Sequence, residues 1–168
     1  EFVSDRLIAL FANIRINAYA HLSIQSGSSK ILKAMNRHYD GAQLREVLEK
    51  LRNVKREEDS AQYMTDLIVG FPGETDADFA DTLEIVEKYG ITQLHAFPFS
   101  AHVDHYSVPA GSFPDQVPNH IAQSRLKTLL KAGEKAFEEY AEKYVGKELR
   151  VLVEKISHFS GFVIPSEA

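Results

Sequence analysis

The chain has 168 residues and a formal charge of −5, and 44% of its residues are hydrophobic. This balance is typical of one folded globular domain and excludes a disordered tail, and the negative charge disfavours general attraction to nucleic acid phosphates. The absence of Cys excludes disulfides, thiolate metal ligands, iron–sulfur ligation and a cysteine nucleophile within these residues.

The sequence contains no membrane-spanning pattern, because no run of about eighteen apolar residues occurs. The first residues, Glu1 to Ser4, lack an initiator Met and the charged-then-apolar layout of a secretory signal. We therefore expect a cytoplasmic excerpt of a longer protein, with no membrane partner.

The first predicted strand covers Tyr19–Gln25, and the hydroxyls of residues 26–29 can cap a short helix at 30–35. A second helix is predicted after Asp40, because Gln43 three residues later gives a capping-box pattern. The apolar residues that follow recur at helical spacing: Leu44, Val47, Leu48 and Leu51.

The second predicted strand covers Tyr63–Gly70 and is broken by Phe-Pro-Gly at 71–73. Thr75 can cap the next helix, which Gly90 ends. The residues expected to point inward from this helix are Phe79, Leu83 and Val86.

The third predicted strand covers Gln93–Phe99 and is followed by a long loop over 100–118, rich in Pro, Gly, Ser and His. A long helix is predicted from Asn119 to about Tyr144, with positive charges on a solvated face from Arg125 onward. Its apolar side is expected to carry Leu126, Leu129, Phe137 and Tyr140.

Strands that alternate with helices predict an α/β fold with a largely parallel sheet. The segment Leu149–Glu154 alternates like a half-exposed strand and predicts a second module. We therefore expect one domain over residues 1–145 and the beginning of a β-module over residues 146–168.

Polar residues gather on one predicted face of the sheet. In parallel β/α sheets, ligands bind at the carboxyl ends of the strands, and side chains alternate between the two faces. One face is therefore expected to carry His21, Ser23 and Gln25 from the first strand, Asp66, Ile68 and Gly70 from the second, and His95, Phe97 and Phe99 from the third.

Asp66 lies within an apolar run, where a carboxylate is costly unless it is paired. It can accept hydrogen bonds from a ribose or orient a basic group, or it can be a strand-end Asp held by backbone amides or solvent. Gly70 and Gly73 can let a flat aromatic ligand approach the backbone, or they can simply form a strand-to-helix turn.

Three further side chains have a chemical and a structural interpretation. Glu74 is an acid–base candidate or a favourable charge before a helix, and His21 and His95 are cofactor contacts or satisfied core residues. A metal site in the long loop is disfavoured because the ligands are irregularly spaced. Its candidates are His102, Asp104 and His105.

Three segments, taken in order, resemble the radical S-adenosylmethionine methylthiotransferases. Residues 66–75 read DLIVGFPGET and are similar to the family's DIIVGFPGET motif. Residues 21–28 with 30–37 resemble its LQSGS stretch and the Leu-Lys-x-Met-x-Arg helix that follows, and residues 95–100 resemble its HxFPYS strand.

The resemblance implies the C-terminal half of a partial, TIM-like (β/α) barrel. Family members place a methylthio group on an adenosine derivative next to the tRNA anticodon or on a ribosomal protein. Residues 95–100 favour the subgroup that acts on threonylcarbamoyladenosine over those acting on isopentenyladenosine or protein. Residues 146–154 resemble the start of the RNA-binding TRAM module, so tRNA is the expected partner of the parent protein.

The resemblance also implies contacts to S-adenosylmethionine. The ribose or substrate side and the adenine pocket would be formed by the ends of the three strands. The expected contact residues are Gln25, Ser26, Asp66, Ile68, Gly70, Phe71, His95 and Phe97.

The sequence departs from the family pattern at two places. The CxxxCxxC loop and the three further Cys that bind the iron–sulfur clusters in the parent are absent, so this chain alone is expected to be inactive. After the third strand the family's SxRxGT is replaced by residues 100–107, SAHVDHYS, so we expect the substrate-facing loop to differ from that of typical members.

Two alternatives stay open. The chain can be a noncatalytic half-barrel that pairs through its edge strand at 19–25 with another copy or with the missing N-terminal half of the barrel. It can also be an ordinary barrel enzyme that uses Asp66, Glu74 and His95 as acid–base groups.

Overall fold

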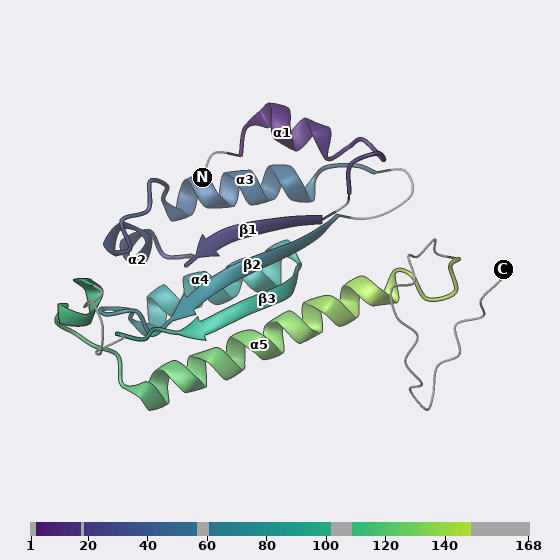
Figure 1. Cartoon of the computed structure of the whole chain (residues 1–168). Helices are drawn as coiled ribbons and strands as arrows, with labels where there is room; N and C mark the ends of the chain where they lie inside the picture. Colours follow the sequence, from purple (N-terminus) through teal and green to yellow (C-terminus); the bar gives the residue numbers. More distant parts are fainter. Residues whose placement is uncertain (1–2, 18, 57–60, 102–108, 149–168) are drawn as a thin grey trace.

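A computed structural model describes residues 3–17, 19–56, 61–101 and 109–148 of the chain (Figure 1). Its centre is a parallel sheet of three strands, ordered β1-β2-β3. The strands are β1 (Tyr19–Gln25), β2 (Gln62–Val69) and β3 (Ile91–Pro98). The predicted α/β fold with a parallel sheet is therefore confirmed.

The N-terminal helices are α1 (Asp5–Leu10), α2 (Ser29–Ala34) and α3 (Gly41–Arg52). The capping box predicted at Asp40 is present: the Asp40 side chain accepts from the N–H of Gln43, whose own side chain accepts from the N–H of Asp40. Helix α1, which was not predicted from the sequence, has six residues and is capped by the Ser4 hydroxyl.

Helix α4 (Asp76–Tyr89) follows β2 and is fixed at both ends by local features. Thr75 caps it in a second capping box, with Asp78 as the partner three residues on. Gly90 ends the helix in the left-handed region, at φ 63°. The caps predicted at Thr75 and Gly90 are therefore both confirmed.

After β3 the chain passes through a short 3₁₀ helix, η1 (Pro109–Ser112), into α5 (Asn119–Glu142). The prediction that Phe137 lies on the apolar side of α5 is wrong, because this ring is 46% exposed. The reason is close packing: a Cβ on Gly133 would lie 2.6 Å from Leu94 Cδ1 in β3, so α5 turns small residues toward the sheet. The buried residues of α5 are Ala122, Arg125, Leu129, Gly133 and Ala136.

The core lies between the helices and one face of the sheet (Figure 1). Along β3 the burial alternates, with Leu94 and Ala96 packed against the core and His95 and Phe97 exposed. The face that carries His95 has no covering element among the described residues. We call it the open face, and it includes His21, Ser23, Asp66, Ile68, His95 and Phe97.

A second, smaller core lies beyond the carboxyl ends of the strands. Its buried members are Ile31 from α2, Phe71 from the β2–α4 loop and Ala110 from η1. The Phe71 ring meets the Phe99 ring edge to face at 5.2 Å and the Phe113 ring at 6.3 Å. The loops that follow all three strands are therefore packed together.

The predicted strand at 149–154 and nearly all of the predicted β-module lie outside the described residues, so the domain boundary at 146 stays a prediction. Among the helices of the described ranges, none combines the length and apolar character needed to cross a membrane.

Candidate functional site

The carboxyl ends of the three strands lie side by side at one edge of the sheet. The pairing is parallel throughout, with Gln25 opposite Leu67 and Val69 opposite Pro98. The expectation that these ends are adjacent and parallel is therefore confirmed, and this edge is where ligands bind in β/α sheets.

Asp66 is the centre of the open face. Its Oδ2 accepts a hydrogen bond from His21 Nε2 at 3.0 Å and from the Ser23 hydroxyl at 3.3 Å. Its Oδ1 lies 3.4 Å from His95 Nδ1. Side chains of β1 thus hydrogen-bond Asp66, and His95 of β3 lies close by, in place of the backbone amides that the sequence left as an alternative.

Aromatic and apolar groups lie between this cluster and the strand ends. Phe97 is 56% exposed and pairs across the sheet with the half-buried Ile68. The Phe97 and His95 rings lie 6.4 Å apart in an edge arrangement. The open face therefore combines a carboxylate, two imidazoles and an accessible aromatic ring, a set that suits a nucleoside.

Gln25 ends β1 in a conformation that residues other than Gly rarely adopt. Its φ is 68°, and the Ser26 N–H donates to the Ile24 carbonyl at 2.9 Å, which makes a three-residue turn. The residue is 9% exposed, and its side-chain amide has no hydrogen-bond partner within the described ranges. Such strain at a strand end is typical of binding positions.

Ser26 points away from the open face, toward α4. Its hydroxyl lies 3.3 Å from the Thr82 hydroxyl and accepts from the N–H of Ser28. The next residue, Gly27, packs so closely on α4 that an added Cβ would lie 2.3 Å from the Asp81 carbonyl oxygen. These contacts give Ser26 a structural role, and its role as a cofactor contact stays a prediction.

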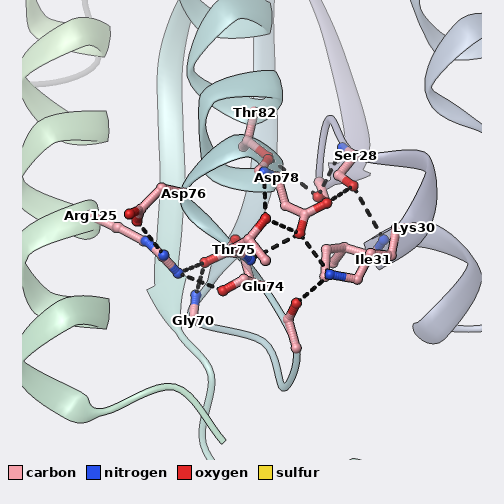
Figure 2. Close-up of polar contacts among 12 residues, drawn as sticks. Ser28, Lys30, Ile31, Gly70, Glu74, Thr75, Asp76, Asp78, Thr82 and Arg125 are labelled. Carbon is pink, nitrogen blue, oxygen red and sulfur yellow. Dashed lines mark hydrogen bonds and ion pairs between the residues drawn. The ribbon is translucent and has the colours of Figure 1, made fainter. Parts of the chain in front are cut away.

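Asp78 joins the loop after β1 to the loop after β2 (Figure 2). Its carboxylate accepts from the Ser28 hydroxyl at 2.6 Å, Lys30 Nζ at 2.9 Å, and the hydroxyl and N–H of Thr75 at 2.6 and 2.9 Å. Burial raises the pKa of Asp78, but these hydrogen bonds outweigh burial and hold that pKa well below its ordinary value. Asp78 therefore stays ionised.

Glu74 forms a buried ion pair with Arg125 of α5 (Figure 2). Glu74 Oε2 lies 2.7 Å from Arg125 Nη1 and also accepts from the Gly70 N–H at 2.7 Å. Arg125 Nη2 continues to Asp76 at 2.7 Å. Burial raises the pKa of Glu74, while the Gly70 hydrogen bond and the Arg125 charge oppose that rise. Glu74 thus anchors the end of β2 to α5.

Gly70 and Phe71 are held by these structural contacts. A Cβ on Gly70 would lie 2.6 Å from Ala122 Cβ, and its N–H is occupied by Glu74. The Phe71 ring is buried in the second core. The close approach at Gly70 is therefore to α5, and direct cofactor contacts by Gly70 and Phe71 stay predictions.

Two residues that shape the site were not among those predicted from the sequence, Arg125 and Asp78. The prediction that Arg125 lies on a solvated helix face is wrong, because Arg125 is buried against Glu74. The available signal was spacing, since Arg125 follows Ala122 by three residues and precedes Leu129 by four. The sequence could indicate only that Asp78 helps to cap α4. Its partners Ser28 and Lys30 are 50 and 48 residues away in the sequence, so no short sequence window contains them.

The metal candidates His102, Asp104 and His105 lie outside the described residues. Within the part of the chain that the structure describes, no group of three or more His, Asp or Glu side chains is arranged to hold a metal ion.

Comparison with known proteins agrees with this architecture. The model of the Radical SAM superfamily matches residues 1–86. A threonylcarbamoyladenosine tRNA methylthiotransferase of Chlamydia pneumoniae is 40% identical over 138 residues, which is 82% of this chain and 31% of that protein. A tRNA-2-methylthio-N(6)-dimethylallyladenosine synthase of Thermobifida fusca is 37% identical over 153 residues, 91% of this chain and 30% of that protein.

A third relative, a threonylcarbamoyladenosine tRNA methylthiotransferase of Thermotoga maritima, is 38% identical over 155 residues, 92% of this chain and 34% of the relative. The chain therefore spans about a third of the length of these curated relatives. It belongs to the radical SAM superfamily. Within that superfamily, it belongs to the methylthiotransferase family that its motifs predicted.

Proposed function

We propose that this chain is part of an enzyme that adds a methylthio group to an adenosine derivative in tRNA, with threonylcarbamoyladenosine favoured. The observation that carries the proposal is the edge where three parallel strands end beside the open face with Asp66, His95 and Phe97. A sheet edge of this kind is a binding site for nucleoside ligands. The names of the similar proteins support the tRNA substrate.

The residues present fit S-adenosylmethionine. The cofactor would supply the adenosyl group and the methyl group of the reaction. Asp66 retains acceptor capacity for ribose hydroxyls, and the exposed Phe97 ring offers a stacking surface for adenine. The unpartnered amide of Gln25 can both donate to and accept from a polar group, and Ile68 supplies an apolar contact.

The same residues do not fit an iron–sulfur cluster, because the chain has no Cys. Cluster ligands would come from the part of the parent that this chain does not contain. We therefore expect anaerobic treatment of the chain with iron and sulfide to leave its visible absorbance unchanged. A stable cluster spectrum would contradict this assignment.

The favoured substrate rests on residues 95–100, which resemble the motif of the threonylcarbamoyladenosine subgroup. Relatives named for threonylcarbamoyladenosine and for dimethylallyladenosine are similarly identical to the chain, at 38–40% and 37% in the cases above. Sequence similarity alone therefore does not choose between the two substrates.

Mass analysis of tRNA nucleosides tests the proposal. We expect deletion of the parent gene to abolish the methylthio form of threonylcarbamoyladenosine, and the full-length gene to restore it. Loss of methylthio-dimethylallyladenosine instead would overturn the favoured substrate. An unchanged set of methylthio nucleosides would overturn the proposed function.

The edge position of β1 supports a second candidate, a binding module that pairs with another strand. The pairing strand would come from the rest of the barrel or from a second copy of the chain. Sedimentation of the isolated chain distinguishes these sources. A dimer favours self-association, and a monomer that associates with the separately expressed N-terminal part favours completion of the barrel.

A further inference from the structure

Strand β1 contains a β-bulge just before its carboxyl end. Leu22 pairs with Thr65 of β2, and the next paired residue of β1, Gln25, lies opposite Leu67. Three steps along β1 thus match two steps along β2, so β1 carries one extra residue at this point. Bulges of this kind are common beside binding sites, where they redirect the strand. This one leads directly into Gln25.

The Thr65 hydroxyl bridges the bulge. It donates to the Leu22 carbonyl at 2.6 Å and accepts from the Ile24 N–H at 3.3 Å. One side chain of β2 therefore satisfies a backbone acceptor and a backbone donor of β1. Thr65 is 0% exposed, so removal of its hydroxyl would leave these two backbone groups without that partner and away from water.

The Tyr39 hydroxyl, between α2 and α3, holds the bulge from a second direction. It donates to the carbonyls of Ser23 and Ile24, at 2.9 and 3.1 Å. The Ile24 carbonyl also accepts from the Ser26 N–H at 2.9 Å, which closes the turn around Gln25. Burial raises the pKa of Tyr39, so its hydroxyl keeps its proton and stays a donor at neutral pH.

Gln25 lies where these contacts meet. Its φ of 68° is in the left-handed region, which residues other than Gly rarely adopt. The residue is only 9% exposed, yet its side-chain amide has no hydrogen-bond partner within the described ranges. Buried amides are normally hydrogen-bonded, and an amide can both donate and accept. A bound ligand would supply the partner that the described part of the chain lacks.

We propose that Thr65 and Tyr39 are positioning residues, whose hydroxyls hold the bulge of β1 and so fix the Gln25 amide in place to bind a ligand. Thr65 is fully buried and acts through the backbone of β1, without touching the ligand. The choice of S-adenosylhomocysteine as the probe rests on the proposed function. The geometry of the bulge rests on hydrogen bonds alone.

Calorimetric titration of the whole chain with S-adenosylhomocysteine measures the effect on binding. Thr65→Val and Tyr39→Phe each remove one hydroxyl and nearly preserve the shape of the side chain. We expect each variant to bind about tenfold more weakly, because the Gln25 amide is no longer held in place. Thr65→Ser keeps the hydroxyl and should stay within about threefold of the wild type. Wild-type affinity in both hydroxyl-deleted variants would overturn the proposal.

Two matched controls remove a buried hydroxyl at the amino end of the sheet. Thr92→Val removes a contact to the Tyr63 carbonyl at 3.5 Å, and Tyr63→Phe removes a hydrogen bond to the Leu51 carbonyl at 2.8 Å. The controls and the bulge variants should all lower Tm by about 2–4 °C. Only the bulge variants should lose affinity, with the controls within about twofold of the wild type. An equal loss of affinity in the controls would reduce the effect to stability and contradict a positioning role.

A double-mutant cycle tests whether the hydroxyls act through Gln25. Gln25→Ala should itself weaken binding about tenfold. Once this amide is absent, adding Thr65→Val should weaken binding by no more than about a further twofold. Two full tenfold losses that multiply would show that Thr65 acts independently of Gln25, against the proposal.

The conformation of Gln25 is read without ligand, from its carbon-13 chemical shifts, which depend on φ. We expect the left-handed conformation in the wild type, Thr65→Ser and both controls, and its loss in Thr65→Val and Tyr39→Phe. If these shifts behave as expected but the wild type does not bind the analogue, the proposed cofactor site fails and the positioning of Gln25 stands. If the analogue binds but the shifts are the same in every variant, the positioning role fails and the proposed function stands.

Discussion

Arg125 Nη1 lies 2.7 Å from Glu74 Oε2, and both side chains are buried. The pair joins the N-terminal half of α5 to the loop after β2, whose Gly70 N–H the same carboxylate oxygen binds. Two atoms of the pair, Glu74 Oε1 and Arg125 Nε, are buried without a partner in the described ranges. Removing one partner would leave the other as an uncompensated buried charge, so it should lower the stability of the fold more than removing both.

We expect Arg125→Met to lower the free energy of unfolding by about 3–5 kcal/mol, because it leaves a buried carboxylate unpaired. Without Arg125, burial raises the pKa of Glu74 further. The stability of the variant is then greatest below the unfolded-state pKa of about 4.3 and falls as pH rises through the folded-state value. Urea denaturation at about pH 5 and pH 8 measures this trend.

The control is Lys135→Met, which breaks an exposed pair with Glu139 and should cost less than about 1 kcal/mol. The double variant Glu74→Gln with Arg125→Met should be more stable than the sum of the single losses. Additive losses would show that the two side chains do not interact.

Because the pKa of Asp78 is lowered in the folded state, we expect the fold to lose stability in acid. Its folded-state pKa is lowered, so its stabilisation is present above the unfolded value of about 3.9 and is lost as pH falls below it. We expect Asp78→Asn to cost about 3 kcal/mol at neutral pH, with a difference from wild type that shrinks below about pH 4. Asp81→Asn, at an exposed position in the same helix, should change stability little at any pH.

Gly70 is expected to matter first for folding. A methyl group at Gly70 would clash with Ala122 and would also sit at a φ of 72°. Gly70→Ala should therefore cost about 2–4 kcal/mol, whereas Gly73→Ala, also at positive φ but with open space around it, should cost about 1 kcal/mol. Adding Ala122→Gly should recover part of the Gly70→Ala loss in thermal unfolding. The absence of any recovery would exclude the steric explanation.

Phe97 and Phe137 form a matched pair of exposed rings, 56% and 46% accessible. Because neither ring is buried, each Ala variant should lose less than about 1 kcal/mol of stability. Only Phe97→Ala should weaken binding of S-adenosylhomocysteine, by about tenfold, through loss of base stacking. Calorimetric titration of both variants measures the affinity for S-adenosylhomocysteine. An equal change in affinity in the two variants would show that Phe97 is not part of the ligand site.

The local features of the fold follow from the sequence alone. Strand β1 was predicted at its observed bounds, and the caps at Asp40, Thr75 and Gly90 were predicted correctly. Capping depends on hydrogen bonds between residues two or three apart, so a short sequence window contains both partners.

The sequence by itself determined the alternation of strands and helices, and with it the parallel sheet. It also determined the polar character of the open face and the absence of Cys ligands for an iron–sulfur cluster. Only the tertiary structure decided that Asp66 lies between His21 and His95, and that Arg125 is buried against Glu74. These partners are 29 to 51 residues apart in the chain. The periodicity of apolar residues in the sequence indicates which residues face inward. The partner that each of these residues contacts is set by strand register and by the packing of α5 on the sheet.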